Sequence, residues 1–207
     1  MGEDSYLIPG TTTLRNKQGI TDPDILSEFE FKISWGRGHS LFNGAKVVNQ
    51  TMAGWRQVHF HLFADVYDWA GKYRTVYLSR PYDGGSSQFS RVEDIDRDGG
   101  AVLKGLQAAM RRFPQNDAAF AAYHLADAYV DLNKVHPFRE GNGRSQRVFF
   151  SLICRPYKIQ IDWSAIPSED HYKAAIAGHR GDPSLMREQF TAMTTKVDGA
   201  PALRLPR

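Results

Sequence analysis

Residues 136–147 hold the densest group of side chains in this chain that could do chemistry. The segment reads His-Pro-Phe-Arg-Glu-Gly-Asn-Gly-Arg-Ser-Gln-Arg, so it combines a proton acceptor, a carboxylate, an amide, two glycines and arginines. Such a set can hold a polyphosphate with a metal ion while activating an attacking hydroxyl. The glycines let the backbone approach an anion closely, because they carry no side chain and can adopt positive φ.

Individual roles follow from the types of these residues. A neutral imidazole at His136 can take the proton from an incoming hydroxyl, which typically accelerates a reaction by about 10²–10⁴. Asn142 can donate an amide N–H to a phosphate oxygen, and the backbone N–H groups around Gly141 and Gly143 complete an anion cradle. Phe138 is expected to anchor the loop in the core.

The apolar run 148–154 predicts a helix that begins directly after the glycines. Its N-terminus would face the loop, where free N–H groups and the helix dipole favour negative charge. Arg144 and Arg147 are three residues apart, so they share a face on the first turn of this helix. Both guanidinium groups can then reach the same polyphosphate, a geometry that lysine would match poorly.

Helices joined by short loops are predicted for most of the chain, which shows no internal repeat or linker. Apolar spacing predicts helices over about 23–35, 49–66, 92–112 and 120–135, with two more after Ser168 and Asp182-Pro183. Gly36-Arg37-Gly38 is expected to end the first of them. Residues 1–195 are expected to form one domain, and 196–207, which lack periodicity, a disordered tail.

Residues Tyr73–Ser79 are rich in β-formers and differ from the helical remainder. A glycine-containing stretch follows at 80–87, and then Gln88-Phe89-Ser90. This pattern predicts a lone β-hairpin over about 74–90. An isolated hairpin is marginally stable, so it must pack on the helices or present an edge to another molecule.

Composition excludes several classes of protein. The net charge of +3 is too small to argue for nucleic-acid binding, and no run of about 18 apolar residues predicts a membrane span. The N-terminus lacks the apolar core of a signal peptide. Cys154 is the single cysteine, so no disulfide is possible within the chain, which favours a reducing cytoplasm. His59 and His61 are two apart on a predicted helix and cannot chelate one metal ion well.

The segment 136–147 resembles the signature of Fic-domain proteins, His-x-Phe-x-Asp/Glu-Gly-Asn-Gly-Arg-x-x-Arg, and matches it at every fixed position. The stretches 9–20 and 63–74 also resemble this family, and the likeness extends over about residues 5–190. The resemblance implies an all-α bundle with the motif loop between two central helices and a small flap hairpin beside it. It also implies a protein adenylyltransferase, which moves AMP from ATP onto a protein hydroxyl.

The resemblance assigns further roles to residues of this chain. Glu140 occupies the acidic position that holds Mg²⁺ between ATP phosphates, and Arg144 and Arg147 would bind the β- and γ-phosphates. The flap would pair with an extended segment of the target and place its Tyr, Ser or Thr hydroxyl under His136. The flap residues expected to do this are Val76, Tyr77, Leu78, Ser79, Gln88 and Phe89.

Regulation is a further implication of the resemblance. Many family members carry an inhibitory helix with the pattern Ser/Thr-x-x-x-Glu-Gly/Asn, whose glutamate competes for the second arginine. In this chain only Glu140 is followed by Gly or Asn, and it belongs to the motif itself. We therefore expect a separate antitoxin whose glutamate contacts Arg147. The alternative is that an inhibitory segment belongs to a longer protein.

Several functions are consistent with this pattern. The first is a stand-alone toxin that adenylylates a protein in the bacterial cytoplasm, with type II topoisomerases as targets by family analogy. The second is a secreted effector domain acting on a host protein such as a small GTPase. Phosphate or phosphocholine transfer is a third, which the complete motif argues against. A non-catalytic nucleotide-binding scaffold would require a damaged motif. Neither a membrane nor a nucleic-acid partner is expected.

Overall fold

Helices dominate the computed structural model, which describes residues 4–44, 48–82, 85–113 and 117–206. The α-helices are α1 (Pro23–Asn43), α2 (Met52–Phe63), α3 (Ile95–Arg111), α4 (Ala118–Val135), α5 (Asn142–Cys154), α6 (Ser168–His179) and α7 (Ser184–Met193). Short 3-10 turns are η1 (Val92–Asp94), η2 (Arg155–Tyr157) and η3 (Trp163–Ala165). In the described ranges, no helix combines the length and the apolar character that crossing a membrane requires.

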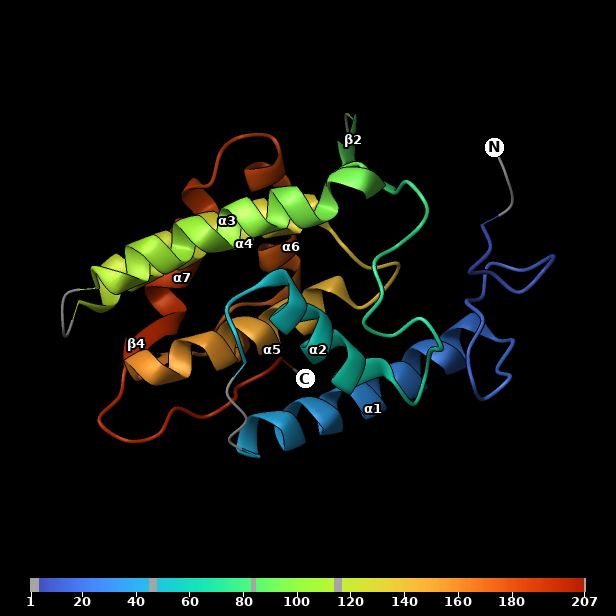
Figure 1. Ribbon diagram of the computed structural model, residues 1–207, viewed down its shortest axis with the longest axis horizontal. Helices are drawn as coiled ribbons and strands as arrows, with labels where there is room; N and C mark the ends of the chain where they lie inside the picture. Colours follow the sequence, from blue (N-terminus) through green and yellow to red (C-terminus); the bar gives the residue numbers. More distant parts are fainter. Residues whose placement is uncertain (1–3, 45–47, 83–84, 114–116, 207) are drawn as a thin grey trace.

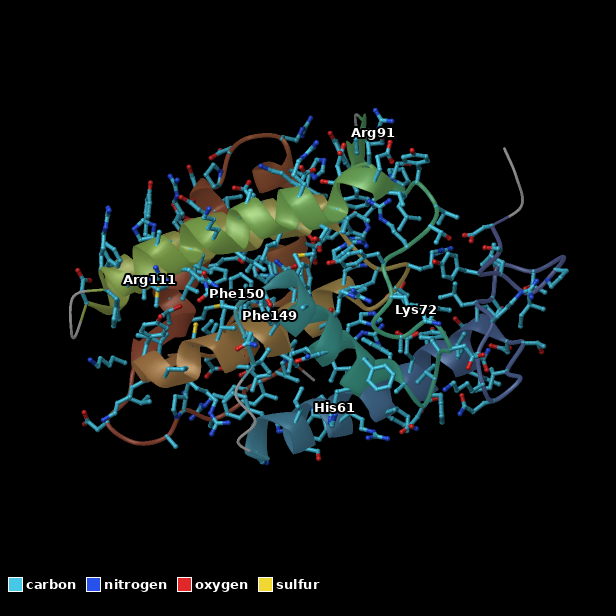
Figure 2. The ribbon with its side chains drawn as sticks, in the orientation of Figure 1. His61, Lys72, Arg91, Arg111, Phe149 and Phe150 are labelled. Atoms are coloured by element: carbon cyan, nitrogen blue, oxygen red, sulfur yellow. The ribbon has the colours of Figure 1, made fainter. Side chains whose placement is uncertain are left out.

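Helix α5 lies at the centre of the bundle. It packs against α2, α1 and α4, while α3 lies alongside α4, and α6 and α7 pack against α4 from the other side (Figure 1). Phe149 and Phe150 on α5 occupy the middle of the molecule (Figure 2) and are fully buried. The helix that follows the glycine-rich loop is therefore held rigidly by its neighbours.

Helix α1 is longer than its sequence predicts. It begins as expected, with the Asp22 side chain accepting from the N–H groups of Asp24 and Ile25. It does not end near Trp35 but continues through both glycines to Asn43. A Cβ at Gly38 would lie 3.3 Å from Cγ2 of Val148, so this glycine allows α1 to pack closely on α5. The expectation that Gly36-Arg37-Gly38 ends the helix was wrong.

The predicted hairpin forms, but its strands are displaced along the chain. Strand β1 (Ser79–Tyr82) pairs antiparallel with β2 (Gly85–Gln88), and Ser79 lies opposite Gln88. The hairpin projects beyond the N-terminal end of α3 (Figure 1), near Arg91 (Figure 2). The β-forming residues 73–78 do not pair as a strand, because side chains and backbone groups in this stretch bind the bundle. Asp83 and Gly84, expected in the turn, lie outside the described residues.

A second small sheet replaces part of the predicted tail. Strand β3 (Ile159–Ile161) pairs antiparallel with β4 (Thr194–Lys196), so the hairpin is not the lone β-structure of the chain. Beyond β4 the chain turns back onto the bundle. The Trp163 N–H donates to the Arg204 carbonyl at 3.0 Å, and Leu203 is buried in the core. The expected disordered tail is instead packed up to residue 206, because its leucines cover apolar surface.

Candidate active site

His136 ends helix α4 in an unusual backbone conformation. Its φ of 47° and ψ of 62° are left-handed, which is uncommon for a residue with a side chain. The His136 N–H donates to the Leu132 carbonyl at 3.2 Å and closes the last turn of the helix. This conformation turns the chain sharply out of α4 into the glycine-rich loop.

The imidazole of His136 is buried beneath the hairpin. The Phe89 ring stacks on it at 3.9 Å between centroids, with 14° between the planes, and only 7% of the residue is exposed. Burial lowers the pKa of His136 to about 3, and the positive charges of Arg80 and Arg74 act in the same direction. The ring is therefore neutral near pH 7, the form that can accept a proton.

Phe138 and Asn142 hold the loop that follows His136. Phe138 is fully buried and stacks on His59 at 3.8 Å. The Asn142 Oδ1 accepts from the Phe138 N–H at 2.9 Å, and its Nδ2 donates to the Phe138 carbonyl at 2.8 Å. Asn142 was expected to donate to a phosphate, but both ends of its amide bind the loop itself. Its first role is to close this turn.

The two glycines of the loop serve different purposes. Gly141 has φ of 78°, and a Cβ there would lie 2.5 Å from the Phe63 ring, so only glycine fits. A Cβ at Gly143 would lie 3.6 Å from Nη1 of Arg147, which is an ordinary contact. The backbone therefore requires glycine only at 141. At 143 the missing side chain leaves the N-terminus of α5, with its free N–H groups, open to an anion.

Glu140 has a carboxylate that is partly open to solvent, with 44% of its side chain exposed. One oxygen accepts from the Gly141 N–H at 2.8 Å and lies 3.3 Å from Arg144. No group of three or more His, Cys, Asp or Glu side chains could hold a metal ion in the described part of the chain. A hard cation at Glu140 would thus take most of its oxygen ligands from a bound substrate and water.

Arg144 is already paired within the protein. Its guanidinium forms an ion pair with Glu30 of α1 and lies 3.4 Å from the Ser34 hydroxyl. Glu30 is buried and also accepts from the Tyr67 hydroxyl. Burial raises the pKa of Glu30, and the nearby charge of Arg144 opposes that rise. The two motif arginines, both expected to reach the same polyphosphate, therefore differ in their surroundings.

Arg147 is the arginine with unused hydrogen-bonding capacity. It lines a cavity of about 210 Å³ together with Arg144, Trp35 and Leu62. Its Nε is buried and has no partner among the described residues. A buried guanidinium nitrogen without a partner is costly, so this site is suited to an anionic ligand.

Only some of the expected flap residues belong to the hairpin strands in the structure. Ser79 and Gln88 pair at the base of the hairpin, and Phe89 leaves β2 to cover His136. Val76, Tyr77 and Leu78 lie outside both strands. Tyr77 is 67% exposed, and its hydroxyl donates to Glu93 at 3.0 Å. The paired part of the hairpin is therefore shorter than its sequence predicts.

His59 contributes to the site although its sequence spacing indicated no role. Its Nδ1 accepts from the Gly71 N–H at 2.9 Å, so its Nε2 carries the proton and donates to the Glu140 carbonyl at 2.9 Å. Burial lowers the pKa of this ring to about 3. Its partner in the motif is 81 residues away. No local sequence signal could have indicated this contact.

Comparisons with known proteins agree with this geometry. Residues 51–154 match the Fic/DOC family. The chain is 32% identical to "Probable protein adenylyltransferase y4lH" of Sinorhizobium fredii, over 92% of this chain and 96% of that protein. It is 28% identical to "Probable protein adenylyltransferase Fic" of Escherichia coli, over 95% and 94%. The crystal structure of BepC, an effector protein from Bartonella tribocorum with bound AMPPNP, superposes with a TM-score of 0.80 at 25% identity, covering 95% of this chain and 99% of that one.

The fold and the loop thus define a helical protein of the Fic type. The chain belongs to the Fic/DOC family. By homology it is a protein adenylyltransferase. The hairpin β1–β2 was expected beside the helical bundle, and the β3–β4 sheet is an addition to that expectation.

Proposed function

We propose that this protein transfers AMP from ATP to a hydroxyl group of a target protein, with His136 as the general base. The neutral, buried imidazole beside the open N-terminus of α5 is the observation that carries the proposal. The target oxygen attacks the α-phosphorus of ATP, and the bond from this phosphorus to the leaving pyrophosphate breaks. The hydroxyl proton passes to the imidazole. The crystallised relative with bound AMPPNP supports ATP as the donor.

Positioning of the polyphosphate is assigned to the loop and to Arg147. The N–H groups at Gly143 and at the start of α5 face the anion, and the guanidinium of Arg147 would bind the outer phosphates. Arg144 would act at the same site while paired to Glu30. The carboxylate of Glu140 would hold Mg²⁺, which supplies charge neutralisation when bound. The partly exposed side chain of Glu140 fits this role.

The hairpin is proposed to dock the target. Residues 79–81 of β1 are exposed, so an extended target segment could add to this edge through main-chain hydrogen bonds. Phe89 joins the hairpin directly to His136 through their stacked rings. A target strand on this edge would carry its hydroxyl toward the imidazole.

A toxin with a separate antitoxin is the proposed biological setting. The cavity that Arg147 shares with Phe31 and Trp35 offers a cation beside partly exposed aromatic rings. A helix with a glutamate, of the pattern Ser/Thr-x-x-x-Glu-Gly/Asn, matches this combination of charge and apolar surface. A type II topoisomerase is the proposed target class. The second candidate is an effector acting on a host GTPase, which the likeness to the Bartonella effector favours.

Transfer of label tests the proposal. The protein is incubated with α-labelled ATP, Mg²⁺ and bacterial lysate, beside His136→Ala. A labelled protein band that the variant does not produce is expected, and mass spectrometry of that band identifies target and residue. A parallel reaction with host-cell lysate tests the effector candidate. Label that enters proteins only from γ-labelled ATP would refute AMP transfer and indicate phosphotransfer.

A further inference from the structure

Arg74 is a fully buried arginine that no described carboxylate neutralises. Only 1% of the residue is exposed, and no ion pair joins it to any Asp or Glu in the described ranges. A buried charge is costly unless it is well hydrogen-bonded. Its partners are instead four backbone carbonyl groups, so the guanidinium organises main chain.

These carbonyls come from both sides of the site. The Arg74 Nε donates to the His136 carbonyl at 2.8 Å, and Nη2 lies 3.4 Å from the Val135 carbonyl. Its Nη1 donates to the Val76 carbonyl at 2.9 Å, and Nη2 also donates to the Ser90 carbonyl. Val76 and Ser90 flank the hairpin 79–88 on its two ends. One rigid guanidinium fork thus joins the end of α4 to both legs of the hairpin.

The backbone around Arg74 strengthens the same junction. The Arg74 N–H donates to the Pro137 carbonyl at 2.8 Å, and the Ser90 N–H donates to the Lys134 carbonyl at 3.0 Å. His136 lies in a left-handed conformation, which persists only where the surroundings hold it. Two hydrogen bonds from Arg74 hold the carbonyls of His136 and of the next residue.

We infer that Arg74 is a positioning residue that fixes the base of the hairpin 79–88 relative to His136. Its guanidinium sets the separation between the strand edge and the imidazole. The hairpin 79–88 and His136 are therefore joined through Arg74 into one structural unit, and the hairpin is not an independent loop. The catalytic consequence rests on the proposed function, since the hairpin is there the docking edge for the target.

Hydrogen exchange measured by mass spectrometry tests the coupling without any substrate. The variant Arg74→Lys keeps the charge but loses the fork, and Arg56→Lys is the matched control. Arg56 is an exposed arginine of the same region that donates to the Gly71 carbonyl and lies over the Tyr73 ring, and among the described residues it makes no hydrogen bond to residues 135–137. In Arg74→Lys, exchange should accelerate by about tenfold or more in peptides covering 76–90 and 134–138. The β3–β4 sheet should be unchanged, and Arg56→Lys should resemble wild type throughout.

A split between binding and transfer gives the second readout. Arg74→Lys should bind AMPPNP with Mg²⁺ within about twofold of wild type, while label transfer from α-labelled ATP falls about tenfold or more. Should the lysine variant not fold, Arg74→Gln replaces it, since it removes the buried charge and keeps donors for one or two carbonyls. Wild-type exchange in both segments, or acceleration spread evenly over the whole chain, would overturn the inference. If wild type transfers no label, the proposed function fails, and the exchange data still decide the role of Arg74.

Discussion

The two hydrogen bonds of His59 can be separated by substitution. In His59→Asn the amide oxygen can take the place of Nδ1 and still accept from the Gly71 N–H. In His59→Gln the amide nitrogen reaches the place of Nε2 and can still donate to the Glu140 carbonyl. Each variant thus keeps one bond and loses the other, and both lose the ring.

The expected loss of stability is similar for the two variants. One buried backbone group left without a partner costs about 1–3 kcal/mol. The lost stack on Phe138, at 3.8 Å, is worth about 0.5–1.5 kcal/mol. We therefore expect the free energy of unfolding, measured in urea, to fall by about 2–4 kcal/mol for His59→Asn and His59→Gln alike.

Activity should distinguish the variants. His59→Asn releases the Glu140 carbonyl, so the loop that carries this carboxylate and Gly141 shifts, and a displacement near 1 Å costs up to about 10² in rate. Label transfer at a temperature where both variants are folded should fall about 10- to 100-fold in His59→Asn and stay within about threefold of wild type in His59→Gln. Equal losses in the two variants would show that His59 acts only through stability, and the reasoning would be refuted.

Two further predictions concern the loop and the pH dependence. Gly141→Ala should lower the free energy of unfolding by about 2–5 kcal/mol, because alanine is strained in the left-handed conformation and its Cβ would lie 2.5 Å from the Phe63 ring. Gly143→Ala should change the free energy of unfolding by less than about 1 kcal/mol. Equal urea midpoints for the two variants would contradict this prediction. The pKa values of His59 and His136 are lowered from 6.5 to about 3 and that of His171 to about 4, so below pH 6.5 the unfolded chain binds protons that the folded chain does not. The stability contributed by these neutral histidines should be fully present above pH 6.5 and should fall as the pH approaches 3, by about 1.4 kcal/mol per pH unit for each histidine. Urea titrations at several pH values that show no such loss would refute the lowered pKa values.

The parts of the fold that depend on local sequence were predictable. Apolar spacing placed α2 and α4, since periodicity reports which face of a helix is buried. Gly38 in α1 was misjudged because it lies against Val148 of α5, and helix propensity does not take such a tertiary contact into account. A Cβ at Gly36 would meet nothing within 4 Å, so the structure shows no packing reason for that glycine. The β-formers at 73–78 were misjudged for the same reason, since their neighbour in space is the motif loop.

The position of the site in the chain could be predicted from the sequence, but the partners of its residues in the folded protein could not. His136, Glu140 and Arg147 lie within one segment of twelve residues, so their nearness along the chain was visible in the sequence. Pairing of Arg144 with Glu30 joins residues 114 apart, and the contact of Arg74 with His136 joins residues 62 apart. Such partners are brought together only by the packed bundle, and a sequence pattern carries no signal for them.

The polar side chains in and around the loop fall into two groups: those that bind the backbone of the loop and those that remain free to act on a ligand. His59, Asn142 and Arg74 spend their hydrogen-bonding capacity on backbone groups of the loop or its flanks, so little remains for a ligand. By contrast, Nε of Arg147 and Nδ1 of His136 are buried without a hydrogen-bond partner among the described residues. Folding alone would favour partners for these groups, because buried polar atoms without them destabilise a protein. In the proposed function, ATP and the target hydroxyl would supply the partners of these two side chains, while the hydrogen bonds of the surrounding loop hold them in place.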